Sequence, residues 1–266
     1  MRTLMRTTGG IPMNANQFFD EGTTRIIENI CSTYQLPHAY LFTILLPAID
    51  HHVNNAQVVC TGGVRTNISF YTSIIGYPGS IKSMAVDIIR SACMDVEKLL
   101  GIEIDKPYIN NSATIESLLN EMKETSCRLF QPWDELNTLI SSFGLYRSEK
   151  AAYDRSIINT LYNTNQIAGA GHPSEVIESV KNDNEGDGLF GRFLLAAPTP
   201  YLPLAEEISD INEDCASLSH FLYIINLLNP AENEYGDPIC MVYKYNEAAE
   251  SIIKGGIIRG FRLIVK

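Results

Sequence analysis

The eight residues from Gly76 to Ser83 read GYPGSIKS and could bind the phosphate groups of a nucleotide. The phosphate-binding loop of many nucleotide hydrolases has the form G-x-x-x-x-G-K-[ST] and lies between a strand and a helix. Glycines let such a loop curl so that its backbone N–H groups point at phosphate oxygens, and the start of the helix adds a positive dipole end. The nucleotide-binding candidates are Gly76, Pro78, Gly79, Ser80, Lys82 and Ser83.

Lys82 and Ser83 carry the specific chemistry of this loop. The lysine of such a loop reaches the terminal phosphates, and the hydroxyl takes a coordination position on Mg²⁺. One position departs from the pattern, because Ile81 stands where a glycine precedes the lysine. A β-branched residue tolerates a positive φ poorly, and its side chain crowds the place of the phosphate. The motif alone therefore leaves two interpretations open, a phosphate loop and a glycine-rich turn that resembles one by chance.

A second motif follows 52 residues after Lys82. The segment RLFQPW predicts a strand that ends in Asp134 and Glu135. In P-loop ATPases a strand beside the loop ends in an acid that holds Mg²⁺, and a following glutamate polarises the attacking water. One predicted helix, one strand and another helix separate the motifs, which is typical of the ATPase class with an extra central strand. We therefore expect Asp134, with Ser83, to bind the metal and Glu135 to be catalytic, although an apolar run followed by two acids commonly marks only a solvated strand end.

Arg192 is the third candidate and lies inside the segment DGLFGRFLLAAP. A basic residue at the edge of a later strand can face the γ-phosphate, within one chain or across a subunit interface, as an arginine finger. The alternative is a surface arginine that pairs with the acids just before it, Asp183, Glu185 or Asp187.

The elements expected around these residues alternate along the chain. Helices are predicted over Asn16–Cys31, Pro37–Val53, Lys82–Leu100, Thr114–Thr125, Ala151–Tyr162, Ser174–Lys181 and Ile208–Leu228. Strands are predicted over Ala56–Cys60, Ile68–Ile75, Tyr108–Ser112, Arg128–Trp133, Phe190–Ala197 and Cys240–Tyr243. This alternation predicts an α/β fold, a P-loop NTPase-like three-layer sandwich with a mainly parallel sheet. The expected organisation is a helical segment at 1–62, the core at 63–203 and a mostly helical tail at 204–266.

The composition of the 266 residues limits the partners and the compartment. A formal net charge of −11 argues against a surface that cradles nucleic acid as a whole, because phosphate binding needs a basic face. No run reaches the roughly 18 apolar residues of a membrane helix, and the first residues hold no signal-peptide core. Six dispersed cysteines predict reduced, buried thiols, and the tandem His51–His52 predicts a helix end rather than a metal site. We expect a soluble intracellular protein, cytoplasmic or nuclear, without a membrane partner.

Six segments of the chain resemble one known family when they are taken together. They read GYPGSIKS, SATIESLL, RLFQPWDEL, INTLYN, GAGHPSEVI and DGLFGRFLLAAPTP. The family is the one catalogued as domain of unknown function 3987, P-loop proteins of phages, plasmids and other mobile elements. Its members often accompany primase domains and look like replicative helicase ATPases. The resemblance runs from about Asn16 to Ile253.

This resemblance implies a domain that binds ATP and hydrolyses it with Mg²⁺ near DNA. It implies Lys82 and Ser83 on phosphate and Mg²⁺, Asp134 and Glu135 as the acid pair, and Arg192 as the basic partner. Because helicases usually take their arginine from a neighbouring subunit, it also implies a homo-oligomer. The alternatives are a degenerate, non-catalytic nucleotide-binding or interaction module, and a structural α/β protein with a chance loop.

Two segments depart from the family pattern. The segment between Tyr162 and Ala170 is short for the usual connection and a full strand that carries a polar γ-phosphate sensor, of which Asn165 or Gln166 would be the remnant. The tail KGGIIRGFRLIVK ends where the family has further helices, so we expect a fragment or a truncated gene product.

Overall fold

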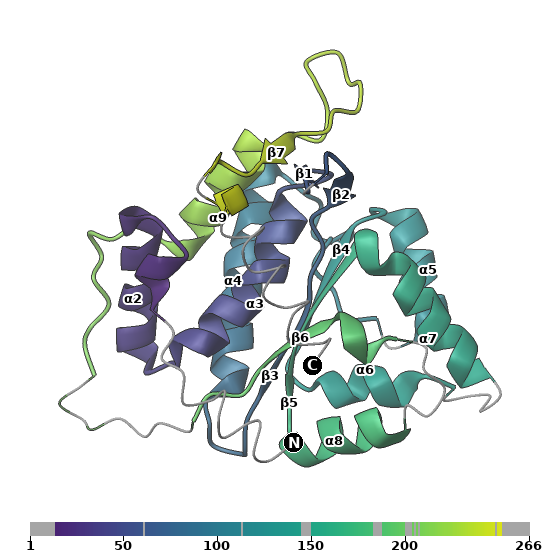
Figure 1. Cartoon of the computed structure of the whole chain (residues 1–266), viewed down its shortest axis with the longest axis horizontal. Coiled ribbons are helices and arrows are strands. Elements are labelled where there is room, and N and C mark those ends of the chain that lie inside the picture. Colours follow the sequence, from purple (N-terminus) through teal and green to yellow (C-terminus); the bar gives the residue numbers. More distant parts are fainter. Residues whose placement is uncertain are drawn as a thin grey trace.

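A parallel sheet with helices on both faces organises the chain (Figure 1). The computed structural model describes residues 14–60, 62–112, 114–144, 150–182, 188–199, 204, 206, 208–247 and 249–251. The α/β class and the mainly parallel sheet are therefore confirmed, and the arrangement is compatible with a three-layer sandwich.

Four strands form the main sheet. They are β3 (Tyr71–Ile75), β4 (Leu129–Trp133), β5 (Asn165–Gly171) and β6 (Phe193–Ala196). Their order is β4-β5-β3-β6, and every neighbouring pair is parallel. All residues of β3, β4 and β5 are buried, as expected for strands that helices cover on both faces. The strand expected at Tyr108–Ser112 is reduced to one parallel bridge between Ile109 and Phe130.

Two helical layers cover this sheet and enclose two apolar cores. One layer holds α2 (Glu21–Tyr34), α3 (His38–His52), α4 (Lys82–Leu100) and α9 (Leu218–Leu228) (Figure 1). The other layer holds α5 (Ile115–Glu124), α6 (Leu136–Ser142), α7 (Ala151–Thr160) and α8 (Pro173–Asn182) (Figure 1). The N-terminal helices are thus part of the first core, in which Tyr40 and Leu41 of α3 pack with Ile89 of α4.

The first predicted helix, Asn16–Cys31, is wrong at its beginning. A 3₁₀ turn, η1 (Ala15–Gln17), comes first, and α2 begins only after Asp20. The Asp20 carboxylate accepts hydrogen bonds from the N–H groups of Gly22 and Thr23, which would otherwise lack partners at a helix start. The cap therefore fixes the start of α2.

The region after residue 204 is less helical than expected in its described part. It contains α9 and one strand, β7 (Val242–Lys244), which joins β1 (Gln57–Val59) and β2 (Arg65–Asn67) in a small second sheet. The helix predicted from Ile208 begins ten residues later at Leu218, where the Ser217 hydroxyl caps it. The residues before it are held as a loop because Asn212 exchanges two hydrogen bonds with Asn29 of α2.

The cysteines are free thiols, but they are not all buried. Only Cys31 and Cys93 are enclosed in the core, and burial raises the pKa of the Cys31 thiol to about 12. Cys127 and Cys240 are exposed because they lie in loops outside both cores. The expectation of buried thiols is therefore wrong for these two residues.

Candidate functional site

The loop Gly76–Ile81 joins the carboxyl end of β3 to the start of α4, the strand–loop–helix setting that the sequence predicted. Gly79 has a φ of +81°. Gly76 has no room for a side chain, because a Cβ there would lie 2.2 Å from the Tyr40 hydroxyl oxygen and 2.3 Å from Ser80 Oγ. Each glycine is therefore required, one for its backbone conformation and the other for a close approach.

Ile81 adopts the conformation that its side chain disfavours. Its φ is +60° and its ψ is +22°, the left-handed region in which a glycine would be unstrained. This conformation costs roughly 1–2 kcal/mol for a residue with a Cβ. The side chain is half-buried against the apolar core below α4, and this packing offsets the cost. The loop thus keeps a glycine-like backbone despite the substitution.

Lys82 is the first residue of α4, and its ammonium group turns back onto the loop. Nζ donates hydrogen bonds to the Tyr77 carbonyl oxygen at 3.0 Å and to Ser80 Oγ at 3.4 Å. Burial lowers the pKa of Lys82, and the carboxylates of Asp134 and Glu135 act against that shift. The lysine therefore lies at the loop and within the electrostatic field of the acid pair.

A hollow of about 460 Å³ lies between the loop and the acid pair. Its lining consists of Pro78, Gly79, Ser80, Ile81, Lys82, Ser83, Asp134, Glu135, Ala170, Gly171, His172 and Glu175. We call it the loop pocket. Of the nine positions that the sequence singled out for the nucleotide, the metal or catalysis, seven line it. Gly76 begins the loop but does not line the pocket, and Arg192 lies elsewhere.

Two side chains, Arg90 of α4 and Asn111, hold the strand that ends in the acid pair. β5 lies between β3 and β4, so the loop and Asp134 face one another across one intervening strand. Pro132 lies in β4, at the edge of the four-stranded sheet, where a missing N–H is tolerated. Its carbonyl oxygen accepts hydrogen bonds from Arg90 Nη2 of α4 and Asn111 Nδ2, both at 2.8 Å. The acids themselves are exposed.

His172, which lies directly after β5, also lines the loop pocket and was not among the residues expected there. Its Nδ1 lies 2.6 Å from Ser174 Oγ, and its ring meets the Tyr77 ring edge-on at 5.6 Å between centroids. The segment before it is a complete seven-residue strand, so the expectation that this segment is too short for a strand is wrong. Asn165 and Gln166 lie at the other end of that strand and do not reach the loop pocket.

Glu175 is a second residue of the loop pocket that the sequence did not lead us to expect. It lies in the first turn of α8, where an acid is favoured by the helix dipole, and it adds a third carboxylate to the loop pocket. A polar residue straight after a buried glycine-rich strand, followed by Pro173, is the sequence signal that could have located both residues.

Arg192 lies at the opposite end of the sheet from the loop pocket. It ends a 3₁₀ turn, η4 (Phe190–Arg192), just before β6, and Phe193 pairs with Tyr71 at the beginning of β3. Its Nη1 donates to the Gly188 carbonyl oxygen at 2.9 Å, and its guanidinium lies 5.8 Å from the centre of the Tyr162 ring. The alternative in which Arg192 faces the loop of its own chain is therefore wrong, and the alternative across a subunit interface stays a prediction. The acids offered as its alternative partners, Asp183, Glu185 and Asp187, lie outside the described residues.

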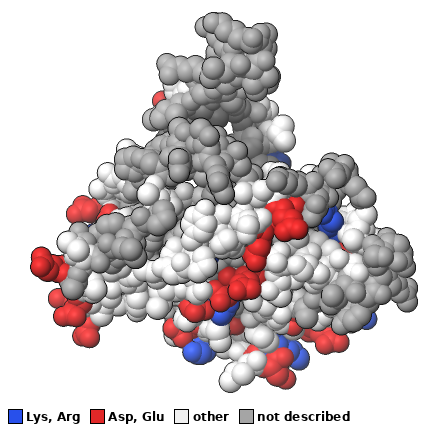
Figure 2. All heavy atoms as spheres, turned by 90° about the horizontal axis from the view of Figure 1, so that it is seen from below, with Lys and Arg blue, Asp and Glu red and all other residues white. Residues whose placement is uncertain are grey.

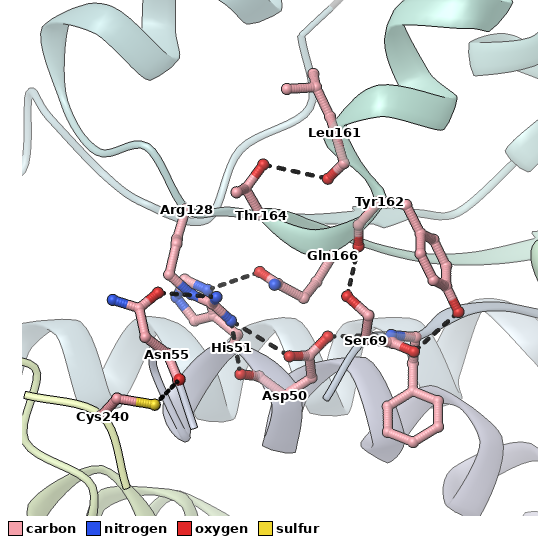
Figure 3. A network of polar contacts seen from close by, with 11 residues as sticks. Asp50, His51, Asn55, Ser69, Arg128, Leu161, Tyr162, Thr164, Gln166 and Cys240 are labelled. Atoms are coloured by element: carbon pink, nitrogen blue, oxygen red, sulfur yellow. Dashed lines mark hydrogen bonds and ion pairs between the residues drawn. The ribbon is translucent and has the colours of Figure 1, made fainter. Parts of the chain in front are cut away.

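The amino end of the sheet holds a different polar cluster, the Asp50 network, made of Asp50, His51, Arg128 and Gln166 (Figure 3). The carboxylate of Asp50 in α3 pairs with Arg128 Nη2 at 3.2 Å and accepts a hydrogen bond from the Phe70 N–H at 3.0 Å. His51 Nδ1 lies 3.4 Å from Gln166 Oε1. These groups join α3 to β4 and β5.

Burial dominates the ionisation of this network. It raises the pKa of Asp50 to about 7, although the Arg128 charge acts in the opposite direction. It lowers the pKa of His51 well below the usual value and that of His52 to about 4. α3 ends at His52, as the sequence predicted, and both histidines are buried as neutral side chains.

The face that carries the loop pocket is rich in acids. Figure 2 looks onto the lower side of Figure 1, where Asp and Glu side chains form a band across the middle and few Lys or Arg side chains interrupt it. The loop pocket contributes Asp134, Glu135 and Glu175 against the single cation Lys82. An anionic ligand here therefore needs a cation to accompany it.

Comparisons of the chain with family models, with curated proteins and with solved structures find no significant match. Among the residues that the structure describes, no helix could span a membrane. The same part of the chain contains no group of three His, Cys, Asp or Glu side chains arranged to hold a metal ion. The geometry of the loop pocket is thus the main source of functional information.

Proposed function

We propose that the loop pocket binds the phosphates of a nucleoside triphosphate, most simply ATP. One observation carries this proposal: the loop that ends in Lys82 and Ser83 faces Asp134 and Glu135 across a single buried strand, in one hollow. The motifs are 52 residues apart in sequence, and a chance glycine-rich turn has no reason to meet an acid pair. Their meeting favours a phosphate loop over that alternative.

The start of α4 supports phosphate binding. Ile81 stands at the N-cap position and offers no side-chain acceptor, so the first N–H groups of this 19-residue helix remain available to an anion. The positive φ of Gly79 and Ile81 curves the backbone in the manner that phosphate loops require. Lys82 would exchange its bond to the Tyr77 carbonyl oxygen for a terminal phosphate.

The oxygen groups beside the loop fit Mg²⁺. This ion is held in nucleotide sites by one or two protein oxygens together with phosphates and waters, so a group of three protein carboxylates is not needed. The Ser83 hydroxyl and the Asp134 carboxylate are the groups that would hold it. When bound, Mg²⁺ would neutralise phosphate charge in this acidic hollow.

Hydrolysis would follow from the position of Glu135. Its exposed carboxylate can accept a proton from a water whose oxygen attacks the γ-phosphorus, while the bond from that phosphorus to the β–γ bridging oxygen breaks and ADP leaves. His172, on the neighbouring strand end, could donate a hydrogen bond to the γ-phosphate. The likeness of the motifs to helicase ATPases points to this reaction near DNA.

An oligomer is part of this proposal because of Arg192. At the far end of the sheet it can reach a loop pocket only in a second copy of the chain. DNA remains a partner by resemblance alone, since the net charge and the acidic face in Figure 2 do not favour it.

The test is calorimetric titration of the full chain with ATP, with and without Mg²⁺. We expect binding that needs Mg²⁺ and that weakens at least tenfold in Lys82→Ala, because the loop loses its phosphate-facing cation. Lys98→Ala is the matched control, since Lys98 lies in the last turn of the same helix, is exposed and pairs with Asp95. A wild-type chain that binds no nucleotide, or equal affinities for the two variants, would refute the proposal.

A binding module without turnover is the second candidate, and the far position of Arg192 favours it for an isolated chain. Phosphate release from ATP, compared between wild type and Glu135→Gln, separates the two. Turnover that Glu135→Gln abolishes supports the ATPase. Tight binding with no turnover in the wild type supports the module.

A further inference from the structure

Tyr40 connects the N-terminal helices to the phosphate loop. It lies in the first turn of α3 and is 2% exposed, so it belongs to the core below α4. Its hydroxyl oxygen lies 3.1 Å from the carbonyl oxygen of Ile75, the last residue of β3, and 3.4 Å from Ser80 Oγ in the loop. One side chain therefore contacts both ends of the loop.

The donors and acceptors around this hydroxyl form one chain. The Ile75 carbonyl can only accept, so the single proton of Tyr40 is donated to it. Ser80 then donates its own proton to the Tyr40 oxygen, and Ser80 Oγ accepts from Lys82 Nζ at 3.4 Å. The chain thus runs from the Lys82 ammonium through Ser80 and Tyr40 to the backbone of β3.

The local sequence is adapted to this contact. A Cβ at Gly76 would lie 2.2 Å from the Tyr40 hydroxyl oxygen, so the hydroxyl occupies the space that the glycine leaves. The Tyr40 hydroxyl is protonated and able to donate near neutral pH, and burial raises its pKa further above the usual value. A phenylalanine at position 40 would fill the same cavity and remove only the hydrogen bonds.

We propose that Tyr40 is a positioning residue for the phosphate loop: its hydroxyl fixes the curvature of the loop between Ile75 and Ser80 and, through Ser80, the place from which Lys82 reaches a phosphate. This role rests on the proposed nucleotide site. It assigns the N-terminal helical segment a part in binding rather than in packing alone.

The test compares Tyr40→Phe with Tyr71→Phe. Tyr71 is also fully buried, and its hydroxyl donates to a carbonyl oxygen, that of Ile158 at 2.9 Å, but at the amino end of the same strand β3. Titrations with Mg-ATP and with inorganic pyrophosphate and Mg²⁺ are the measurement, and urea unfolding reports stability. We expect Tyr40→Phe to weaken both ligands about three- to tenfold, as the loss of a hydrogen bond predicts, and Tyr71→Phe to bind as the wild type does.

A double-mutant cycle separates positioning from mere stability. Ser80 and Tyr40 belong to one series of hydrogen bonds, so their hydroxyls act through each other. Ser80→Ala should therefore weaken pyrophosphate binding less in the Tyr40→Phe background than in the wild type. Independent effects, or equal affinities of wild type, Tyr40→Phe and Tyr71→Phe, would overturn the role of Tyr40 and leave the nucleotide site intact. A wild-type chain that binds neither ligand would overturn the nucleotide site, and with it the role of Tyr40.

Discussion

The two ends of the parallel sheet differ in the burial of their charged groups. At the amino end, Asp50 and Arg128 are buried and bound to one another, and the neighbouring histidines are neutral (Figure 3). At the carboxyl end, Asp134 and Glu135 are exposed beside a loop that holds Ile81 in a strained conformation. Burying charges in pairs fixes elements relative to one another, whereas exposed charges remain available to a ligand.

This difference separates fold from function within one sheet. The Asp50 network joins α3 to β4 and β5, so its loss should loosen the packing of the N-terminal helices. The loop pocket contributes little to packing, because its polar side chains are exposed or only half-buried. Substitutions at the amino end should therefore change stability, and substitutions at the carboxyl end should change ligand binding.

The largest expected effect is on stability at the amino end. Arg128→Met should lower the free energy of unfolding by about 3–5 kcal/mol at pH 8, where Asp50 is ionised and would lose its buried partner. Lys82→Met, at the carboxyl end, should change it by less than about 0.5 kcal/mol. Urea unfolding of both variants is the measurement. If Lys82→Met lost as much stability as Arg128→Met, the separation of the two sheet ends into a stabilising end and a binding end would be contradicted.

The next effect is the pH dependence of stability, which the buried histidines dominate. Because the pKa of folded His52 is about 4, the unfolded chain binds more protons between pH 6.5 and 4, and stability falls as the pH falls through this window. One such histidine is worth about 3 kcal/mol over that window. His52→Leu should therefore flatten the loss measured by urea unfolding from pH 7 to pH 4.

Asp50 is the control for His52, because its effect on the pH dependence of stability has the opposite sign. Its raised pKa means that the folded chain holds a proton below pH 7, so its contribution to stability is present at low pH and disappears as the pH rises through about 7. Asp50→Asn should therefore make the free energy of unfolding fall more steeply between pH 7 and pH 4, whereas His52→Leu should make it fall less steeply. If plots of the unfolding free energy against pH are parallel for the wild type and both variants, Asp50 and His52 do not set the pH dependence.

Local patterns predicted most of the fold. The span of α4 follows from a helical period that begins directly after the loop. The helix predicted over Thr114–Thr125 is α5, and its start is fixed because the Thr114 hydroxyl oxygen accepts a hydrogen bond from the Ser117 N–H. β3 and β4 are apolar and β-branched or aromatic enough to be recognised as covered strands. β5 was missed because NQIAGAG has little strand propensity, and only its burial between β3 and β4 makes it a strand.

The site was predictable in its motifs but not in its long-range contacts. The loop and the acid pair each have a local pattern, and a parallel sheet brings strand ends together. Tyr40 contacts Ser80 of the loop, which is 40 residues away in sequence, and no pattern in α3 predicts that contact. The position of Arg192 was predicted wrongly because the strand expected from Phe190 begins only at Phe193. The arginine therefore lies before β6, at the amino end of the sheet.

The smallest expected effect is that of Ile81→Gly, and it tests whether the carboxyl end is degenerate. The loop already has the left-handed backbone that a glycine would adopt, so glycine should change the Mg-ATP affinity by less than about threefold. Relief of roughly 1–2 kcal/mol of strain is offset by the lost packing of a half-buried side chain and by added backbone entropy, and stability should change by less than about 1 kcal/mol. Ile81→Ala, which loses the packing but keeps the Cβ, should be the least stable of the three chains in urea. An affinity gain above tenfold in Ile81→Gly would instead indicate that the isoleucine blocks the phosphate, and the carboxyl end would then be a disabled site on an intact fold.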